Sequence, residues 1–288
     1  MSHTKQLSDN PATRWNGHAG RAWVEAQGLL EQLFKPLEDL LSQQISTGSG
    51  MRLLDVGCGT GSTTIAAARR LGTSGQCVGI DISEPMITAA RIRAERDGVP
   101  ASFLLADAQT HHFAPESFDM IISRFGVMFF EDFVKAFTNL RHAAMDGASL
   151  RFVAWRSVAD NPFMTTAERA AAPLLPNLPV RQADAPGQFA FADDRRVRRI
   201  LEESGWSAID IRPVDVACSM PEKELIRYFT QLGPVGLALQ DADDLTRKRV
   251  IETVRAAFNR YVNGDDVRFT AACWIVCAEA QQAPVPPK

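Results

Sequence analysis

The stretch LLDVGCGTG, residues 53–61, is the most informative part of this sequence. Its apolar residues around Asp55 predict a buried strand, and Gly57, Gly59 and Gly61 predict a tight turn that opens a helix. Glycine reaches backbone angles closed to other residues, and its missing side chain lets a ligand approach the main chain. The stretch therefore predicts a nucleotide-type binding site.

Strands and helices alternate outward from this turn. Apolar runs predict strands at 51–56, 76–81, 101–106, 118–123 and 150–155. Apolar residues at helical spacing predict helices at 62–71, 84–97 and 132–144. Continuous apolar strands that alternate with helices are typical of an α/β fold, in which helices cover both faces of a parallel sheet and ligands bind at the carboxyl ends of the strands.

The remaining segments lack the regular alternation of strands and helices seen in this core. Residues 1–50 predict an N-terminal helical lid with an amphipathic helix over 15–46, which Pro36 should kink or divide. With the core at 51–155, the rest of the chain is divided into a proline-rich cap insertion at 156–192, a core helix and strand at 193–217, a helical cap insertion at 218–264, a last core strand at 265–280 and a disordered tail at 281–288.

Composition and charge exclude several classes of protein. The chain has 288 residues, 45% of them hydrophobic, and a net charge of −3, so nothing predicts a nucleic-acid or membrane partner. Five scattered cysteines argue against a disulfide framework, and Cys273 and Cys277 lack the further ligands of a metal site. The N-terminus lacks an apolar signal segment and no run is long enough to span a membrane, so we expect a cytoplasmic protein without a bound metal.

Three carboxylates lie at or near the ends of the predicted strands. Asp81 ends the second strand, where a carboxylate can accept hydrogen bonds from both ribose hydroxyls. Asp107 follows the third strand and can accept from an adenine amine, while Asp55 can fix the glycine turn or meet a ligand's ammonium group. Three carboxylates around one site suit a ligand with positive charge better than a pyrophosphate.

The ordered set LLDVGCGTG, VGID, ADAQ and FDMIISRFGVMFF resembles the class I S-adenosylmethionine-dependent methyltransferases, especially the quinone-biosynthesis and small-molecule branch. The resemblance covers most of the chain. It implies a Rossmann-like, mostly parallel sheet of seven strands with helices on both faces, in which the last strand, 267–278, runs antiparallel. It also implies a helical cap built from the insertions.

The same resemblance implies a set of cofactor contacts. The methionine part of S-adenosylmethionine would lie against the glycine turn, the ribose on Asp81, the adenine between apolar side chains, and the sulfonium beside the end of the fourth strand. The implied cofactor-binding residues are Asp55, Gly57, Cys58, Gly59, Asp81, Ile82, Met86, Asp107, Ala108, Ser123, Arg124 and Phe125. Cys58 is interpreted as small turn packing, because no base adjoins it that would make it a nucleophile.

The acceptor pocket is expected where the insertions overhang the sheet, and its side chains suggest an apolar or aromatic small molecule. The predicted lining is Trp15, Trp23, Phe125, Met128, Phe129, Trp155, Phe163, Phe189, Phe191 and Phe229. Some of these rings would fill the core of the cap instead, and Trp15 and Trp23 either anchor the lid or face the acceptor. Phe130 and Phe133 are assigned to the core.

Methyl transfer is a one-step displacement, so alignment and exclusion of water matter before any acid or base does. An oxygen or carbon nucleophile still requires removal of a proton, and His18 in the lid is the best candidate base among the histidines. Arg124 either neutralises a carboxylate of the cofactor or acceptor, or pairs with a structural acid.

Two other functions remain open from the residues. A nicotinamide-dependent dehydrogenase would also place a carboxylate 20 residues beyond Gly61, although Ser62 breaks its glycine spacing and neither Tyr228 nor Tyr261 has a lysine four residues on. A non-catalytic S-adenosylmethionine-binding protein is the third class, because methyl transfer has no obligatory catalytic residue. The sequence leaves the acceptor, the methylated atom and the oligomeric state open.

Overall fold

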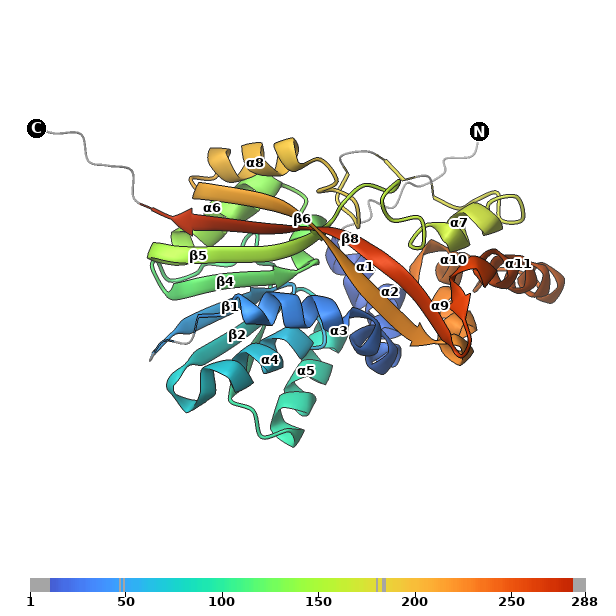
Figure 1. Cartoon of the computed structure of the whole chain (residues 1–288). Helices are drawn as coiled ribbons and strands as arrows, with labels where there is room; N and C mark the ends of the chain where they lie inside the picture. Colours follow the sequence, from blue (N-terminus) through green and yellow to red (C-terminus); the bar gives the residue numbers. More distant parts are fainter. Residues whose placement is uncertain (1–10, 47, 49, 180, 183–184, 282–288) are drawn as a thin grey trace, which may run out of the picture.

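The structure is a computed structural model that describes residues 11–46, 48, 50–179, 181–182 and 185–281 (Figure 1). The predicted tail, apart from Gln281, and the first ten residues of the predicted lid lie outside the described residues.

A mostly parallel sheet forms the centre of the fold. Its main strands lie in the order β3-β2-β1-β4-β5-β8-β6, and β8 runs antiparallel to both of its neighbours. The strands are β1 (Arg52–Val56), β2 (Gln76–Asp81), β3 (Ala101–Leu105), β4 (Phe118–Arg124), β5 (Ala144–Trp155), β6 (Ser207–Pro221) and β8 (Asp266–Ala280). The predicted sheet and its antiparallel last strand are confirmed, and a two-residue strand, β7 (Val262–Asn263), pairs with β8 as an unpredicted eighth.

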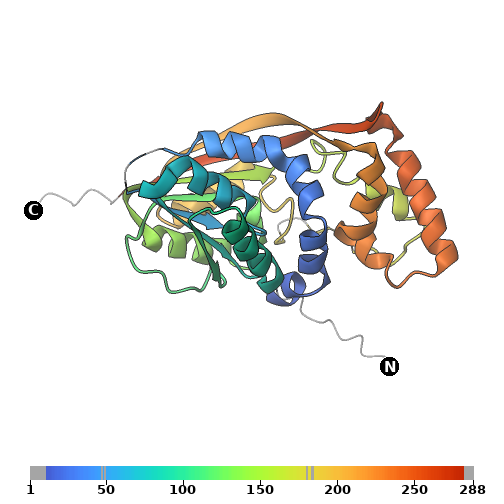
Figure 2. The ribbon, with the colours of Figure 1, turned by 90° about the horizontal axis from the view of Figure 1, so that it is seen from below.

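Helices cover both faces of the sheet. On one face lie α3 (Gln27–Gln43), α4 (Ser62–Leu71) and α5 (Glu84–Arg96), and on the other lie α6 (Phe133–Ala143) and α8 (Asp194–Glu203) (Figure 2). The short 3₁₀ turns are η1 (Gly72–Ser74), η2 (Gly126–Phe129), η3 (Glu222–Glu224) and η4 (Asn259–Tyr261). Within the described part of the chain, no helix is long and apolar enough to cross a bilayer.

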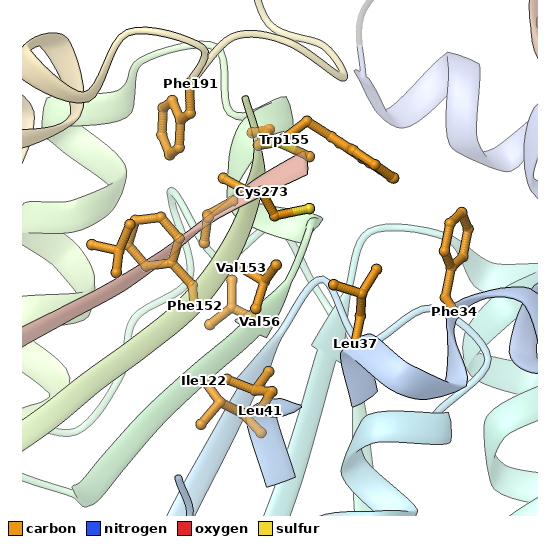
Figure 3. Packing of buried hydrophobic residues seen from close by; sticks show 14 of the residues in the cluster. Phe34, Leu37, Leu41, Val56, Ile122, Phe152, Val153, Trp155, Phe191 and Cys273 are labelled. Carbon is orange, nitrogen blue, oxygen red and sulfur yellow. The ribbon is translucent and has the colours of Figure 1, made fainter. Parts of the chain in front are cut away.

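The core between the α6 face and the sheet is rich in phenylalanine. Phe152 of β5 and Phe191 lie close together in Figure 3, with ring centroids 5.9 Å apart. Phe137 of α6 packs against both, at 5.8 and 6.2 Å. All three side chains are fully buried, and burial of such rings contributes about 1.5 to 3 kcal/mol each to folding.

The N-terminal segment differs from the prediction of one helix over 15–46. It forms three helices, α1 (Pro11–Asn16), α2 (His18–Glu25) and α3, with breaks at Gly17 and Ala26. Pro36 lies inside α3 without dividing it. The buried apolar face of α3 packs against β4, β5 and β6, and this packing outweighs the backbone hydrogen bond that a proline removes.

The cap stands at one end of the sheet. It contains α7 (Thr166–Ala171), α9 (Leu225–Gln231), α10 (Gly233–Ala238) and α11 (Asp244–Ala257). Strands β6 and β8 run beyond the central sheet as a long two-stranded ribbon that reaches these helices (Figure 1). The boundary expected at 217 and 218 therefore falls inside β6, which continues to Pro221.

Strand β5 also begins six residues before the predicted start at Leu150. Exposed Asp146 and Gly147 interrupt its early residues, so these carry no continuous apolar run. Cross-strand pairing, with Phe118 opposite Ala144, extends the strand instead.

Asn161 joins the cap to the ribbon. Its side chain is buried, Oδ1 accepts from the N–H of Ala272 at 2.9 Å, and Nδ2 donates to the carbonyl of Ala272 at 2.9 Å. Nδ2 also donates to the carbonyl of Ser157 at 3.1 Å. The amide thus pairs with β8 as an added strand residue would.

We expect Asn161→Leu to lower the free energy of unfolding by about 2 to 3 kcal/mol, because it leaves the buried N–H of Ala272 without a partner. Urea unfolding monitored by circular dichroism measures the change. Asn259→Leu, at an exposed asparagine bonded to Arg255, is the matched control and should change stability by less than about 0.5 kcal/mol. Equal stability of Asn161→Leu and the wild type would contradict this role.

Candidate functional site

A cavity of about 470 Å³ lies at the carboxyl ends of β1, β2 and β4, beyond the end of β3 and beneath α1 and α2. This is the edge of a parallel sheet where ligands bind. It is lined by Ala12, Trp15, Trp23, Val56, Gly57, Gly59, Ile80, Asp81, Ile82, Met86, Ala106, Asp107, Ala108, Gln109, Arg124, Phe125, Gly126, Phe129, Phe130 and Glu131.

The glycine turn after β1 forms one wall. Gly57 has φ +67° and Gly59 has φ +54°, angles that side-chain-bearing residues rarely adopt. A Cβ at Gly57 would lie 2.5 Å from Cα of Gly126, so the loops after β1 and β4 touch through two glycines. The backbone is exposed to the cavity at this contact.

Asp81 stands at the end of β2 with its carboxylate held by main-chain donors. Oδ1 accepts from the N–H of Ser83 at 2.9 Å, and Oδ2 accepts from the N–H of Gly59 at 2.9 Å. Burial raises the pKa of Asp81 above its usual value, and the donated hydrogen bonds oppose that rise. The carboxylate lines the cavity and so links strand β2 to the glycine turn.

Asp107 shapes the loop after β3. Its Oδ1 accepts from the N–H of Gln109 at 2.9 Å, which places Asp107, Ala108 and Gln109 together on the cavity wall. The Gln109 side chain reaches away and accepts from the N–H of Asp132, the first residue before α6, at 2.8 Å. The two acidic strand ends, Asp81 and Asp107, are therefore brought to one cavity.

The end of β4 is strained and firmly held. Phe125 has φ +69°, in the left-handed region, which costs of order 1 to 2 kcal/mol for such a residue. Its ring stacks on Trp155 at 4.6 Å and 7°, and it lines the cavity. Ser123 secures the turn, because its hydroxyl donates to the carbonyl of Val56 at 2.7 Å and accepts from the N–H of Gly126 at 3.1 Å.

A group of charges lies under the cavity floor. Asp55 is 1% exposed and accepts a hydrogen bond from Oγ1 of Thr64 at 2.7 Å. Burial raises the pKa of Asp55 to about 7, against the opposing effects of Thr64 and the Arg124 charge. Arg124 donates to Oγ of Ser62 at 2.8 Å, and burial lowers its pKa while Glu38 and Asp55 oppose that change. Nearby acids thus favour the charged form of Arg124, which its burial disfavours.

Aromatic side chains form the roof and the adjoining wall. Trp15 of α1 meets Trp23 of α2 edge to face at 5.9 Å and Phe129 of η2 at 5.3 Å. All three line the cavity, with Phe125 and Phe130. The side of the cavity toward β4 therefore carries most of the aromatic rings, whereas the side toward β2 and β3 carries Asp81 and Asp107.

Several predicted cofactor residues do not line the cavity. Asp55 accepts a hydrogen bond from Thr64, and the Ser123 hydroxyl donates to the carbonyl of Val56. Cys58 packs with Ile65 and Phe103 in a small apolar cluster. Burial raises the pKa of the Cys58 thiol well above its usual value, which leaves it a poor nucleophile. These residues support the wall from behind.

Most of the rings predicted for the acceptor pocket from the cap also lie elsewhere. Phe163 stacks on Phe269 at 3.9 Å, Phe229 stacks on Phe258 at 6.0 Å, and Phe189 lies under the guanidinium of Arg181. Phe191 belongs to the α6 core, Met128 is fully buried, and Trp155 reaches the cavity only through Phe125. These apolar side chains pack in the cap or in the central core and do not line this cavity.

Other lining residues were missed by the sequence analysis. They are Ala12, Val56, Ile80, Ala106, Gln109, Gly126, Glu131 and Phe130, the last having been assigned to the core. Val56, Ile80 and Ala106 directly precede predicted site residues at strand ends, so strand-end position was the available signal. Ala12 carried no such signal.

His18, the predicted base, does not line the cavity. Its ring lies at hydrogen-bond distance from the side-chain amide of Gln240 in the cap, 2.9 Å from Nδ1. Among the cavity-lining residues of the described chain, the ionisable side chains are Asp81, Asp107, Arg124 and Glu131. In this structure α2 turns His18 toward the cap while Trp23 faces the site, so the geometry gives the predicted base no support.

The five cysteines are all buried free thiols, as Cys58, Cys77, Cys218, Cys273 and Cys277. Over the described residues, no group of three or more His, Cys, Asp or Glu side chains is arranged to hold a metal ion.

The raised pKa of Asp55 predicts a pH dependence of stability. Between about pH 4 and 7 the folded protein keeps a proton on Asp55 that the unfolded chain has lost, so the free energy of unfolding falls as pH rises through this range. The slope is at most about 1.4 kcal/mol per pH unit for one proton. We expect Asp55→Asn to reduce this decrease in the free energy of unfolding, because the variant no longer binds that proton. Urea unfolding at about pH 5 and about pH 7.5 measures the difference.

Asp97→Asn is the control for that series. Arg96 and Arg69 lower the pKa of Asp97, so its contribution is lost only as pH falls below the usual carboxyl range. It should leave the slope over the tested range unchanged. A wild-type slope retained by Asp55→Asn would contradict the assignment.

Curated relatives match part of the chain in sequence. The uncharacterized protein Rv1405c of Mycobacterium tuberculosis is 28% identical over 60% of this chain and 60% of its own length. Aklanonic acid methyltransferase DauC of a Streptomyces species is 33% identical over 42% and 56%, and a demethylmenaquinone methyltransferase of Lactiplantibacillus plantarum is 32% identical over 37% and 46%. The chain thus spans 60% or less of the length of these relatives.

Solved structures share the fold. YcgJ of Bacillus subtilis superposes with a TM-score of 0.56, at 16% identity over 85% of this chain and 98% of its own. The cyclase SpnF also gives a TM-score of 0.56, at 18% identity over 92% and 96%. At these identities the likeness establishes the fold alone.

A family model described as a methyltransferase domain matches residues 47–205, more than half of the chain. The match includes the glycine turn, Asp81, Asp107 and the strained end of β4. The resemblance seen in the sequence is therefore confirmed, and the chain belongs to the methyltransferase-domain family.

Proposed function

We propose that this protein transfers a methyl group from S-adenosylmethionine to a small apolar or aromatic organic acceptor. The observation that carries the proposal is Asp81, a carboxylate fixed by two main-chain N–H groups at the wall of the cavity, opposite a roof of aromatic rings. Membership of the methyltransferase-domain family supports the same reaction.

The cavity walls fit the parts of this cofactor. Asp81 can accept from the ribose hydroxyls, while Ile82, Met86 and Ala108 offer apolar walls to the adenine and Asp107 lies at its edge. Gly57 and Gly59 leave their main chain open to the methionine part. Because Asp55 does not reach the cavity, we propose that it supports the turn and does not meet the ammonium group directly.

S-adenosylmethionine, when bound, supplies an activated methyl group whose departure leaves a neutral thioether. The chain's own contribution is then to align the acceptor and exclude water. Phe125, Phe129, Trp15 and Trp23 supply flat apolar surfaces for both purposes. The names of the relatives, aklanonic acid and demethylmenaquinone methyltransferases, agree with a small organic acceptor.

The ionisable groups at the cavity narrow the acceptor further. The lining residues include three carboxylates, on Asp81, Asp107 and Glu131, and one cation, on Arg124. This balance disfavours an anionic acceptor. Among the described lining residues, Glu131 is the carboxylate left for removal of a proton once Asp81 and Asp107 hold the nucleoside.

Asp81→Asn should weaken binding of S-adenosylhomocysteine by about ten- to a hundredfold, because hydrogen bonds to a charged acceptor contribute roughly 1.5 to 3 kcal/mol each. Isothermal titration calorimetry measures the dissociation constant. Asp97→Asn, on the surface at the end of α5, is the matched control and should bind as the wild type does. Wild-type protein that binds NADH but not S-adenosylhomocysteine would instead favour a dehydrogenase.

Trp23→Ala should lower kcat/KM for the acceptor by roughly tenfold or more, since loss of about 1.4 kcal/mol of contact gives that factor. The acceptor is first found by transfer of radiolabelled methyl to a panel of phenols, quinones, amines and carboxylic acids. Affinity for S-adenosylhomocysteine should change much less. Trp274→Ala, at a half-buried tryptophan outside the cavity, is the control, and an equal loss there would refute a role of Trp23 in the pocket.

No transfer to any member of the panel, despite cofactor binding, would favour a cofactor-binding protein without methyltransferase activity. The solved cyclase with the same fold shows that the fold alone does not decide the reaction.

A further inference from the structure

We propose that Asn16 and Ser83 are positioning residues that connect the aromatic roof, Trp15 and Trp23, to the loop between β2 and α5. Binding of the cofactor on that loop then positions Trp15 for the acceptor. The hydrogen bonds of Asn16 and Ser83 are called the latch below. This inference rests on the proposed function for the identity of the two ligands. It assigns a role to α1 that neither the family match, which begins at residue 47, nor the sequence analysis provides.

Asn16, the last residue of α1, clamps the loop between β2 and α5. Its Nδ2 donates to the carbonyl of Ile82 at 3.0 Å, and its Oδ1 accepts from the N–H of Glu84 at 2.7 Å. Glu84 is the first residue of α5, whose own N-cap residue, Ser83, makes no capping hydrogen bond with its side chain. Asn16 therefore caps α5 from a helix 66 residues or more away in sequence.

Ser83 uses its side chain for the roof instead. Its Oγ donates to the carbonyl of Trp15 at 2.7 Å, while its own N–H donates to Oδ1 of Asp81 at 2.9 Å. One residue thus connects the proposed ribose carboxylate to the main chain of the tryptophan in the roof. The Trp15 ring then contacts Trp23 and Phe129 on the acceptor side.

Helix α2 packs closely against Trp15 and Ser83 at Gly20. A Cβ at Gly20 would lie 1.9 Å from the carbonyl oxygen of Trp15 and 2.8 Å from Oγ of Ser83. At the other end of α2, Arg227 of the cap donates to the carbonyl of Glu25 at 2.6 Å. The roof is therefore held between the loop after β2 and the cap.

This arrangement couples the two halves of the cavity. A nucleoside on Asp81 and Ile82 restrains the loop 81–84, and Asn16 and Ser83 pass that restraint to Trp15. By thermodynamic linkage, whatever stabilises the roof must also tighten the nucleoside. We expect the cofactor and the acceptor to tighten each other's binding by the same factor.

Hydrogen–deuterium exchange on the full-length protein tests the latch. In the wild type, S-adenosylhomocysteine should slow exchange of amides in residues 12–25 as well as in the glycine turn. In Asn16→Ala and Ser83→Ala the turn should still be protected, whereas residues 12–25 should not be. The dissociation constant for S-adenosylhomocysteine should rise about tenfold in Asn16→Ala, since both hydrogen bonds to the loop between β2 and α5 are lost.

Two further variants separate positioning from simple stability. Asn16→Asp keeps the acceptor for the N–H of Glu84 but loses the donor to Ile82, so it should fall between Asn16→Ala and the wild type. Thr13→Ala, at an exposed residue of α1, should match the wild type in exchange and affinity. For the acceptor, Asn16→Ala should raise KM more than it lowers kcat.

The outcomes distinguish the two proposals. If the wild type does not bind S-adenosylhomocysteine, the proposed function fails and the latch fails with it. If the wild type binds S-adenosylhomocysteine, and the ligand protects residues 12–25 in Asn16→Ala and Ser83→Ala as well as in the wild type, only the proposed role of Asn16 and Ser83 is overturned. Should Asn16→Ala unfold, Ser83→Ala decides by the same exchange measurement.

Discussion

The contact between Gly57 and Gly126 is the constraint on which the site depends. It allows the loops after β1 and β4 to meet, with the hydroxyl of Ser123 joining the carbonyl of Val56 to the N–H of Gly126. A side chain at either glycine would separate the two loops. Phe125, next to Gly126, adopts the left-handed region, and its ring stacks on Trp155 at the cavity wall.

Ionisable side chains are buried beneath this contact, and their hydrogen bonds reduce the free-energy cost of burying them. Asp55 and Glu38 are both buried. Burial lowers the pKa of Arg124, whereas both acids raise it. Isolated buried charges would cost several kcal/mol each, whereas opposite charges and hydrogen bonds offset part of that cost. The arrangement ties α3, β1 and β4 together through polar groups as well as through apolar packing, and Arg124 itself lines the cavity.

The roof and the cap depend on contacts between distant parts of the chain. Strands β6 and β8 extend past the sheet and carry the cap, and Asn161 pairs with β8 to hold the intervening segment in place. The cap in turn meets α2 through Gln240 and Arg227. Residues from both ends of the sequence therefore define how the cavity is covered, although the family match lies between them.

The sequence by itself determined the alternating core, the glycine turn and the acidic strand ends, because local periodicity and turn chemistry mark them and because parallel strands bring their carboxyl ends to one edge. It predicted β2 at 76–81 with the observed bounds and brought Asp81 and Asp107 to one site. Only the tertiary structure decided that Phe163, Phe191 and Phe229 fill cores and that His18 faces the cap, since an apolar or polar side chain has no local signal for which distant element it will meet. The division of the N-terminal segment at Gly17 and Ala26, and not at Pro36, was decided in the same way, by packing of α3 on the sheet and of Gly20 against Trp15.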